Sequence, residues 1–311
     1  MKVLVPTGNP NNMVRFADIG EPAPATDEAV IAVEAFSLNR GETYLLESPR
    51  PGWRPGKDVA GRVVRAAADG TGPRVGTRVV GHPPANGWAE RVCVPVRQLA
   101  EIPESMTASM AAALPLAGLT AIRLLRAAGS LTGRRVLMTG AAGGVGHFFT
   151  ELATAAGAEV TVVVRDRDRG SRLRELGAQN VVTKVADAAE SMDVILESVG
   201  GETLGDAVSR LAPRGRLLWF GQAGRAPATL DFFAFFNRHQ SATIQHFDYT
   251  DSDVSDADDL ATLVRLTASG RLHPEIGTVR PWEETSALIA DLRARRVRGK
   301  AIVELNQSSE N

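Results

Sequence analysis

Short valine-rich runs, separated by segments that contain proline and glycine, dominate the first third of the chain. Apolar runs bounded by turn-forming residues are typical of β-strands. We assign strands to residues 2–5, 29–35, 61–66, 77–80 and 88–94. From Met110 onward alanine and leucine become frequent, and residues 119–128 are predicted to form a helix that ends at Gly129.

The middle of the chain alternates between apolar strands and amphipathic helices. A strand is expected over 135–139, and the apolar residues of 145–156 then recur at the i, i+3 and i+4 spacing of a helix. The run 160–164 is typical of a strand buried on both faces of a parallel sheet. Further units follow up to a strand over 217–220. Repeated units of this kind predict an α/β fold with a doubly wound, Rossmann-type parallel sheet.

The last part of the chain, from about residue 256, is predicted to contain helices and a terminal strand over 301–305. We therefore expect a nucleotide-binding domain over 114–250, preceded by a β-rich part over 1–113 and followed by a shorter part over 251–311. The cleft between the flanking parts and the central domain is the expected place for chemistry.

A glycine-rich loop connects the first strand of the central domain to its helix. Glycines allow a tight turn there, backbone N–H groups can approach a pyrophosphate, and the helix N-terminus adds a positive dipole. The G-x-G-x-x-G template is met with Ala141 in its first position, and the strand–loop–helix–strand context supports a dinucleotide site over an ordinary turn. The residues expected to hold the pyrophosphate are Ala142, Gly143, Gly144, Val145 and Gly146.

The end of the second strand indicates which dinucleotide binds. An NAD site usually has an acidic residue there, which holds the ribose 2′-OH. This chain has Arg165 at that position and Arg169 one helical turn later, and two guanidinium groups suit the 2′-phosphate of NADPH. The alternatives are a solvated charged turn, or a site in which Asp166 holds the 2′-OH of NADH.

Composition and charge exclude several other classes of protein. The 311 residues are 44% hydrophobic and 23% charged, and the net charge of −1 gives no reason to expect nucleic acid or an anionic membrane as a partner. No apolar stretch is long enough to cross a bilayer, the start has no signal-peptide layout, and a cytoplasmic location is expected. The single cysteine, Cys93, allows neither an internal disulfide nor a thiolate zinc cluster.

Motifs of other enzyme classes are missing from the sequence. It contains no H-E-x-x-H, no G-x-S-x-G and no P-loop. The histidines show no metal-ligand spacing. They are His82, His147, His239, His246 and His273.

Ordered motifs along nearly the whole chain carry a resemblance to a known family. These motifs are Ser37-Leu38-Asn39 with Thr43-Tyr44, the segments 55–61, 87–90, 112–121, 140–146 and 197–201, and the pairs Pro281-Trp282 and Gly299-Lys300. In them the chain resembles the medium-chain dehydrogenases/reductases, and among these the zinc-free quinone oxidoreductases. The resemblance implies a GroES-like catalytic domain built from the N- and C-terminal parts, with the nicotinamide in the interdomain cleft.

The resemblance also implies that no zinc is bound. Zinc alcohol dehydrogenases, which are similar, have a cysteine and a Gly-His-Glu segment at two places where this chain has Asn39-Arg40-Gly41 and Gly56-Lys57-Asp58. Without zinc to polarise an oxygen, we expect an acceptor that takes hydride readily, such as a quinone or an α,β-unsaturated carbonyl compound.

By the same resemblance, Asn39, Tyr44 and Thr120 are placed near the nicotinamide or the substrate. There they could stabilise developing charge, and Tyr44 could donate a proton. The alternatives are that Asn39 closes a turn, Tyr44 fills a wall of the site and Thr120 is an ordinary helix residue. The further residues expected at the cofactor are Gly221, Gln222 and Lys300.

The expected function is NADPH-dependent reduction of a quinone or enone. Two alternatives remain, an enoyl-thioester reductase of a biosynthetic pathway and a non-catalytic NADPH-binding protein. A planar-substrate pocket could be shaped by aromatic side chains that otherwise belong to the core or an interface. These are Trp53, Phe232, Phe233, Phe235 and Phe236. The resemblance further implies a homodimer paired through an edge strand near residues 242–245.

Overall fold

The computed structural model describes residues 1–235 and 240–305, so Phe236, His239 and the last six residues lie outside the described part of the chain. The chain forms two compact units. One consists of Met1–Leu119 with Asp253–Asn311, and the other is Thr120–Ser252. The boundary after Leu119 falls inside helix α3 (Pro115–Ala128), which begins with the proline favoured in a first helical turn.

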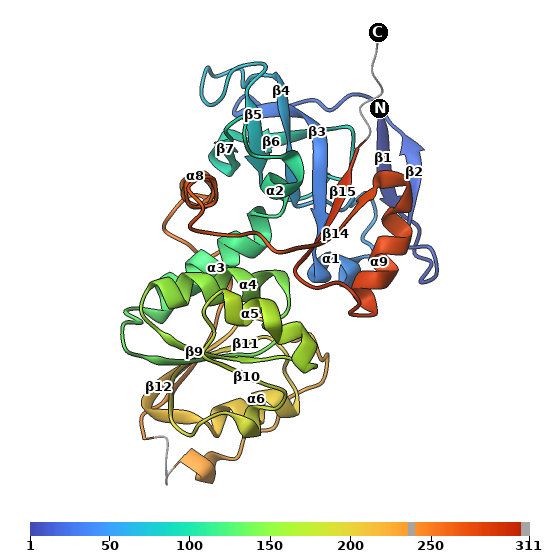
Figure 1. The fold of residues 1–311 in the computed structure, drawn as a ribbon. Coiled ribbons are helices and arrows are strands. Elements are labelled where there is room, and N and C mark those ends of the chain that lie inside the picture. Colours follow the sequence, from blue (N-terminus) through green and yellow to red (C-terminus); the bar gives the residue numbers. More distant parts are fainter. Residues whose placement is uncertain (236–239, 306–311) are drawn as a thin grey trace. The chain divides into compact units, whose positions relative to one another are not determined.

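The first unit is built on a seven-stranded sheet, shown in Figure 1. Six strands lie in the order β14-β15-β3-β4-β5-β7, and β6 pairs with β3 beside this path. The bounds are β3 (Glu28–Leu38), β4 (Asp58–Arg65), β5 (Arg78–Gly81), β6 (Arg91–Pro95), β7 (Leu99–Glu101), β14 (Ile276–Pro281) and β15 (Lys300–Glu304). Because β15 pairs antiparallel with β3, the C-terminal part of the chain completes the N-terminal sheet, as expected.

An antiparallel hairpin of β1 (Lys2–Pro6) and β2 (Val14–Asp18) and four short helices accompany this sheet. The helices are α1 (Arg40–Leu45), α2 (Ala108–Ala112), α8 (Asp256–Ala268) and α9 (Thr285–Arg293). The Ser255 side chain accepts a hydrogen bond from the Asp258 amide and so begins α8. In the core, Phe36 stacks on Trp88 with ring centroids 5.5 Å apart.

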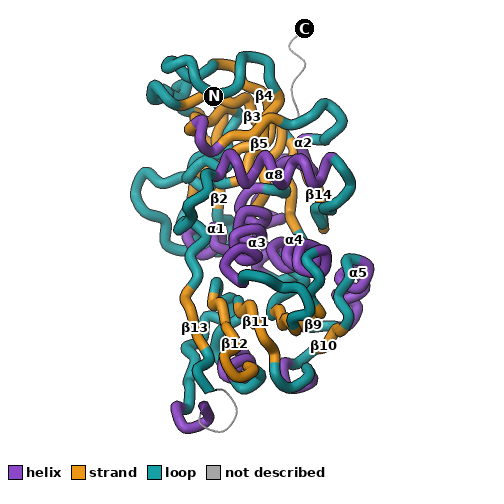
Figure 2. Tube along the Cα trace, turned by 90° about the vertical axis from the view of Figure 1, so that its left-hand side faces the viewer, coloured by secondary structure: helices purple, strands orange, loops and turns teal. Residues whose placement is uncertain are grey.

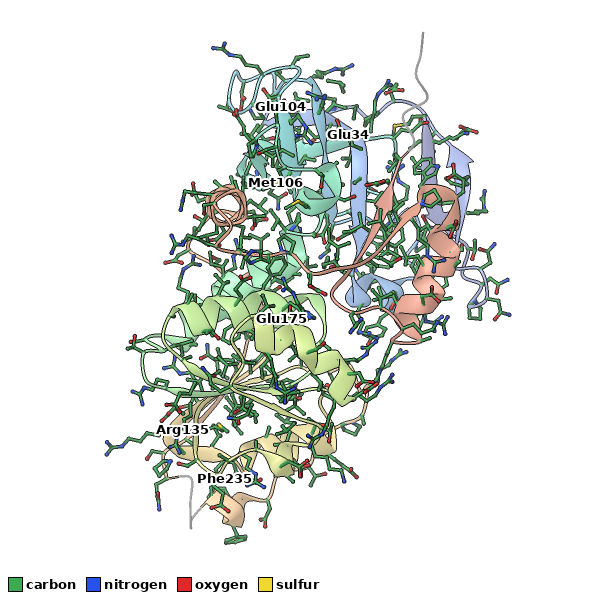
Figure 3. The ribbon with its side chains drawn as sticks, in the orientation of Figure 1. Glu34, Glu104, Met106, Arg135, Glu175 and Phe235 are labelled. Atoms are coloured by element: carbon green, nitrogen blue, oxygen red, sulfur yellow. The ribbon has the colours of Figure 1, made fainter. Side chains whose placement is uncertain are left out.

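Ion pairs outside the core fix the edge of this sheet. Arg78 is 8% exposed, and its guanidinium lies 4.0 Å from Glu34 and 3.8 Å from Glu104. Both carboxylates are labelled in Figure 3. Arg78 also donates to the carbonyl oxygens of Pro103 and Glu104, so its charge is compensated within the first unit.

The second unit is a six-stranded parallel sheet in the order β10-β9-β8-β11-β12-β13. Its strands are β8 (Arg135–Met138), β9 (Glu159–Val163), β10 (Asn180–Val182), β11 (Met192–Glu197), β12 (Leu211–Trp219) and β13 (Thr243–His246). The chain runs outward from β8 to β10, returns to β11 beside β8, and then runs outward on the other side. This is the predicted Rossmann order, and the strand order reverses between β8 and β11.

Helices cover both faces of this sheet. Helices α4 (Gly144–Ala155) and α5 (Ser171–Glu175) lie on one face and α6 (Glu202–Val208) lies on the other (Figure 1). Short loops connect them to the strands, as the tube in Figure 2 shows. A 3-10 turn, Arg167–Gly170, directly precedes α5, and the Asp166 side chain caps that turn. Within residues 1–235 and 240–305, no helix is long and apolar enough to cross a membrane.

Candidate functional site

The glycine loop of the second unit ends at the N-terminus of helix α4. Gly143 is the N-cap residue and has no side chain to cap the helix. The first backbone N–H groups of a helix have no partners within the helix, and its dipole is positive at that end. Gly140 has a φ of 61°, in the left-handed region that favours glycine. The N-terminus of α4 is therefore a place where a pyrophosphate can bind.

Two glycines of this loop have different roles. A Cβ atom at Gly146 would lie 2.1 Å from the carbonyl oxygen of Ala141, so only glycine allows α4 to approach the loop this closely. A Cβ atom at Gly143 would have Gly140 O, at 3.4 Å, as its nearest neighbour. The space beside Gly143 is therefore open, and the loop fits the phosphates of a dinucleotide.

The arginines predicted for the 2′-phosphate follow strand β9. Arg165 is exposed, and Arg169 is half-buried in the 3-10 turn. Asp166 Oδ1 accepts a hydrogen bond of 3.2 Å from the Asp168 amide. This carboxylate caps the 3-10 turn, and the choice between Arg165 and Asp166 as the side chain that meets the ribose stays a prediction.

A buried polar cluster lies where the strand order reverses. Thr139, which follows β8, and Glu197, which ends β11, are both fully buried, and Thr139 Oγ1 donates to Glu197 Oε1 at 3.1 Å. Glu197 also accepts hydrogen bonds from the amides of Val199 and Gly200. Burial raises the pKa of Glu197, and these hydrogen bonds oppose that shift.

Gly221 and Gln222 follow strand β12 on the same edge of the sheet. A Cβ atom at Gly221 would lie 3.1 Å from the carbonyl oxygen of Ser198, so the two loops are in close contact. The side-chain amide of Gln222 donates a hydrogen bond from Nε2 to the carbonyl oxygen of Ala226 at 2.8 Å. Their predicted place beside the nicotinamide stays a prediction.

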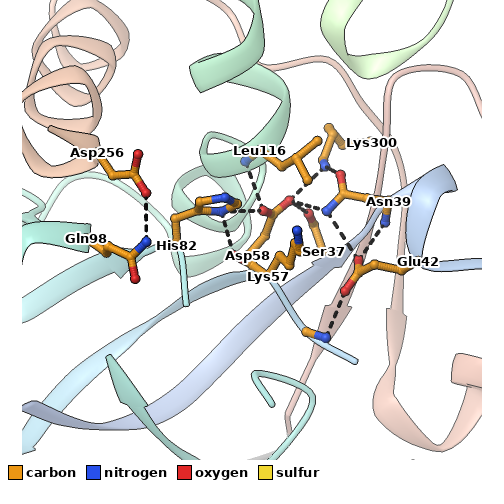
Figure 4. A network of polar contacts seen from close by, with 11 residues as sticks. Ser37, Asn39, Glu42, Lys57, Asp58, His82, Gln98, Leu116, Asp256 and Lys300 are labelled. Carbon is orange, nitrogen blue, oxygen red and sulfur yellow. Dashed lines mark hydrogen bonds and ion pairs between the residues drawn. The ribbon is translucent and has the colours of Figure 1, made fainter. Parts of the chain in front are cut away.

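A second buried polar network lies in the first unit and centres on Asp58, the first residue of β4 (Figure 4). Asp58 is fully buried, and its carboxylate accepts hydrogen bonds from Ser37 Oγ at 2.6 Å and from the Leu116 amide at 2.9 Å. Lys300 Nζ lies 3.0 Å from Asp58 Oδ2, and His82 Nδ1 lies 3.5 Å from Oδ1. Although burial opposes ionisation, Lys300 and the hydrogen bonds from His82 and Ser37 hold the pKa of Asp58 well below its usual range.

The structure brings two predicted site residues, Asn39 and Lys300, together in this network. Lys300 Nζ donates to Asn39 Oδ1 at 2.6 Å. Asn39 Nδ2 donates to Asp58 Oδ2 at 2.8 Å and to Glu42 Oε2 at 3.3 Å. Since an amide carries two N–H groups, both are engaged, and none remains for a substrate oxygen in this arrangement. Asn39 also precedes α1 as its N-cap, the turn-closing role considered as an alternative.

Glu42 is the second carboxyl group of the network. It is 2% exposed, and it accepts hydrogen bonds from the amides of Asn39 and Gly56. Burial and the nearby charge of Asp58 raise the pKa of Glu42 to about 7, although those amides and Lys300 oppose the shift. A buried carboxyl group that titrates near neutral pH can couple this network to pH.

The remaining predicted residues have the following positions. Tyr44 is half-buried on α1, and Thr120 is buried on α3. Within the described residues, no group of three or more His, Cys, Asp or Glu side chains could hold a metal ion.

The aromatic side chains predicted to shape a pocket belong to both units and differ in exposure. Trp53 packs against the core of the first unit, and Phe235, labelled in Figure 3, packs against that of the second. Phe232 and Phe233 are 68% and 75% exposed. The predicted Phe236 lies outside the described residues.

Sequence reasoning missed the buried acids Glu42, Asp58 and Glu197 as parts of these networks. Two of them could have been found, because Asp58 and Glu197 are single acidic residues at the ends of apolar strand runs. Such a carboxylate is buried with its strand and must be paired or hydrogen-bonded.

Two family models match the chain. The alcohol dehydrogenase GroES-like domain matches residues 25–104, and the zinc-binding dehydrogenase model matches residues 144–267. A quinone oxidoreductase of Pseudomonas aeruginosa is 27% identical over 313 residues, which cover 94% of this chain and 95% of that protein. The mouse synaptic vesicle membrane protein VAT-1 homolog-like is 30% identical over 240 residues, or 72% of this chain. The chain spans 57% of that relative's length.

Solved structures share the fold over nearly the whole chain. The Escherichia coli quinone oxidoreductase complexed with NADPH superposes with a TM-score of 0.87 at 20% identity, covering 98% of this chain and all of that one. A mycobacterial protein complexed with NADPH gives a TM-score of 0.85 at 25% identity, covering 97% and 98% of the two chains. The CurK enoyl reductase gives 0.84 at 23% identity, covering 98% and 99%.

The Rossmann sheet, its glycine loop and the completed N-terminal domain define an oxidoreductase with a dinucleotide-binding domain. The chain belongs to the medium-chain dehydrogenase/reductase superfamily, in its quinone oxidoreductase branch.

Proposed function

We propose that this protein transfers hydride from NADPH to a quinone or to an α,β-unsaturated carbonyl compound, without a metal ion. The observation that carries the cofactor choice is the exposed Arg165, two residues after the end of β9, with Asp166 capping the next turn. A guanidinium at this position suits a 2′-phosphate, which NADH lacks. The NADPH complexes of two structural neighbours support the same choice.

The nucleotide-binding unit has a group for each part of the cofactor. The backbone amides of residues 142–146 would hold the pyrophosphate, and Arg165 with Arg169 would hold the 2′-phosphate. Gly221 and Gln222 would face the nicotinamide end. Bound NADPH supplies the hydride from its nicotinamide ring.

Lys300 supports the proposal that no zinc takes part. Asn39 and Asp58, which stand close to the positions of zinc ligands in similar dehydrogenases, already bind the Lys300 ammonium at 2.6 and 3.0 Å. A divalent cation at these oxygen atoms would be repelled by the buried ammonium. Without a Lewis acid, the acceptor must itself be electron-poor, as quinones and enones are.

Tyr44 is the proposed proton donor for an enone. Asn39 has both amide N–H groups engaged within the network, so its side chain contributes to the position of α1 rather than to the chemistry. Tyr44 lies on this helix, is half-buried, and carries a hydroxyl group that can give a proton to the α-carbon after hydride transfer. A Tyr44→Phe variant is expected to lose turnover of enones and to keep its affinity for NADPH. Unchanged enone turnover would exclude this role.

An enoyl-thioester reductase is the second candidate. A mycocerosic acid synthase-like polyketide synthase of Mycobacterium tuberculosis is 28% identical over 327 residues. These cover 98% of this chain and 15% of that protein. Quinones, enones and enoyl thioesters are all reduced by hydride transfer, so the acceptor itself has to be tested.

The test of the proposed function is NADPH oxidation with a panel of acceptors. 1,4-Benzoquinone, an alkenal, a cyclic enone and crotonyl-CoA are each added to the full chain, with NADH in parallel. We expect turnover of a quinone or a free enone with NADPH, unchanged by a metal chelator. A strong preference for crotonyl-CoA would favour the second candidate. NADPH binding with no turnover of any acceptor would contradict an enzymatic role, and loss of activity with the chelator would contradict metal independence.

We also propose that the protein is a homodimer paired through β13. This strand forms an edge of the six-stranded sheet, and Thr243, Gln245 and His246 on it are exposed. An edge strand can pair with its copy in a second chain. Light scattering should give about twice the 33.0 kDa of one chain, and a mass of one chain would contradict the proposal.

A further inference from the structure

We infer that Thr139 and Glu197 position the cofactor: they lock the pyrophosphate-binding loop to the nicotinamide-side loop across the point where the strand order reverses. This inference rests on the proposed function and concerns the same site. Neither residue need touch the cofactor, so each is a positioning residue.

Hydrogen bonds between Thr139, Glu197 and Ser198 join the C-terminal ends of the two central strands, β8 and β11. Thr139 Oγ1 donates to Glu197 Oε1 at 3.1 Å and accepts a hydrogen bond from the Ser198 amide at 3.0 Å. Ser198 Oγ in turn donates to the carbonyl oxygen of Thr139 at 3.3 Å. Two of these three contacts are made by the hydroxyl group of Thr139 and one by its carbonyl oxygen, and together they link the end of β8 to the turn that follows β11.

The position of this link is the reason to assign it a function. Ligands of doubly wound sheets bind at the carboxyl ends of the strands, in the crevice where the strand order reverses. That point lies here between β8 and β11. Thr139 directly precedes Gly140, so a shift of its backbone moves the glycine loop as well. A Cβ atom at Gly140 would lie 2.7 Å from Ser198 Oγ, which shows how closely the two loops approach.

Glu197 extends the link to its own turn. Its carboxylate accepts hydrogen bonds from the backbone amides of Val199 at 2.8 Å and Gly200 at 3.0 Å. The buried carboxylate therefore holds the backbone of the turn that follows β11. Gly200 in this turn has a φ of 76°, a backbone conformation that glycine adopts readily. A buried carboxylate with three donors is costly to remove, because each donor would then be left without a partner.

A third loop is attached to the same turn. The amide of Ala223 donates to the Ser198 carbonyl oxygen at 2.9 Å, and that of Gly224 donates to the Val199 carbonyl oxygen at 2.7 Å. The loop that carries Gly221 and Gln222 is therefore held by the turn that Glu197 organises. The predicted contacts of the pyrophosphate and of the nicotinamide are thus connected through one buried pair of side chains.

This arrangement predicts an asymmetric effect on ligands. The adenosine end meets Arg165 and Arg169 at the end of β9, away from the link. The nicotinamide end depends on the turns after β11 and β12. Loss of the link should therefore weaken NADPH binding, whereas adenosine 2′-monophosphate, which has neither the pyrophosphate nor the nicotinamide, should bind as before.

The experiment is calorimetric titration of both ligands into the full chain and into Thr139→Val, which has the shape of threonine without its hydroxyl group. We expect about a 10-fold or greater loss of NADPH affinity and at most about a 2-fold change for adenosine 2′-monophosphate. Thr139→Ser keeps the hydroxyl group and should keep both affinities. Equal losses for both ligands would show a general structural defect, and an unchanged NADPH affinity would show that the link does not position the cofactor; either result overturns the inference.

A second variant keeps the inference testable if Thr139→Val does not fold. Glu197→Gln retains the size of the side chain but places an amide N–H group against backbone donors, so it should shift the two affinities in the same unequal way. Wild-type protein that binds neither ligand would contradict the proposed function itself, and the inference with it. Normal binding by the wild type with symmetric losses in the variants would contradict only the inference.

Discussion

Lys300 Nζ lies 3.0 Å from Asp58 Oδ2, and this buried ion pair joins strand β15 to strand β4 within the first unit. The two residues are 242 positions apart in the chain. Their pairing ties the C-terminal part of the chain to the N-terminal sheet, in addition to the backbone pairing of β15 with β3.

Replacement of Lys300 by methionine should destabilise the first unit. Asp58 would stay buried as an anion without its cation, and breaking one side of such a pair costs about 3–5 kcal/mol. Urea unfolding followed by tryptophan fluorescence measures the change, because three of the four tryptophans, Trp53, Trp88 and Trp282, lie in this unit.

The double variant Lys300→Met with Asp58→Asn is the control. It removes both charges, so it should recover a large part of the lost stability. A loss below about 1 kcal/mol for Lys300→Met alone would show that Asp58 does not depend on its partner.

Glu42 should make the stability of the first unit depend on pH. Its pKa is raised to about 7 in the folded protein, so the folded state binds more protons than the unfolded state above pH 4.5. The free energy of unfolding should therefore fall as pH rises from about 5 to 8, by about 3 kcal/mol from this group. The pKa of Asp58 is lowered, so its own contribution is lost only at more acidic pH.

The comparison is with Glu42→Gln, in which nothing titrates at this position. Urea unfolding of both proteins at pH 5 and pH 8 isolates the contribution of Glu42. We expect a steeper fall for the wild type; parallel pH profiles would show that Glu42 stays ionised throughout this range.

Two glycine substitutions should separate folding from binding. Gly146→Ala places a methyl group 2.1 Å from Ala141 O, and it should lower the stability of the second unit by about 1–3 kcal/mol. Gly143→Ala meets open space and should cost less than about 1 kcal/mol, yet its methyl group would crowd the phosphates and weaken NADPH binding. Urea unfolding followed by far-UV circular dichroism measures the stability of the two variants, and NADPH titration measures their binding. An equal stability loss for both variants would contradict the assignment.

The cofactor preference should depend on two arginines. Arg165→Ala with Arg169→Ala removes the proposed partners of the 2′-phosphate, and it should weaken NADPH binding about 100-fold while NADH binding changes about 2-fold or less. Arg174→Ala, an exposed arginine on the following helix, controls for general loss of charge. Equal losses for NADPH and NADH would show that the 2′-phosphate lies elsewhere.

Periodicity and motif context predicted the fold well, because both signals are local. The run 160–164 and the glycine loop before α4 were enough to predict a parallel sheet with a dinucleotide loop, and the structure confirms that fold. The site was harder to predict. Asn39 and Lys300 were singled out as individual residues, but their contact with Asp58 depends on β15 pairing with β3, a long-range arrangement that no local pattern reveals.

The most direct test of the proposed chemistry follows the hydride itself. NADPH with deuterium in place of both hydrogens at nicotinamide C4 is oxidised by the protein in the presence of a cyclic enone, and the product is examined by mass spectrometry and NMR. We predict one deuterium per molecule of saturated ketone, on the β-carbon. A product without deuterium at that carbon, or no reduced product at all, would contradict hydride transfer from NADPH to an enone.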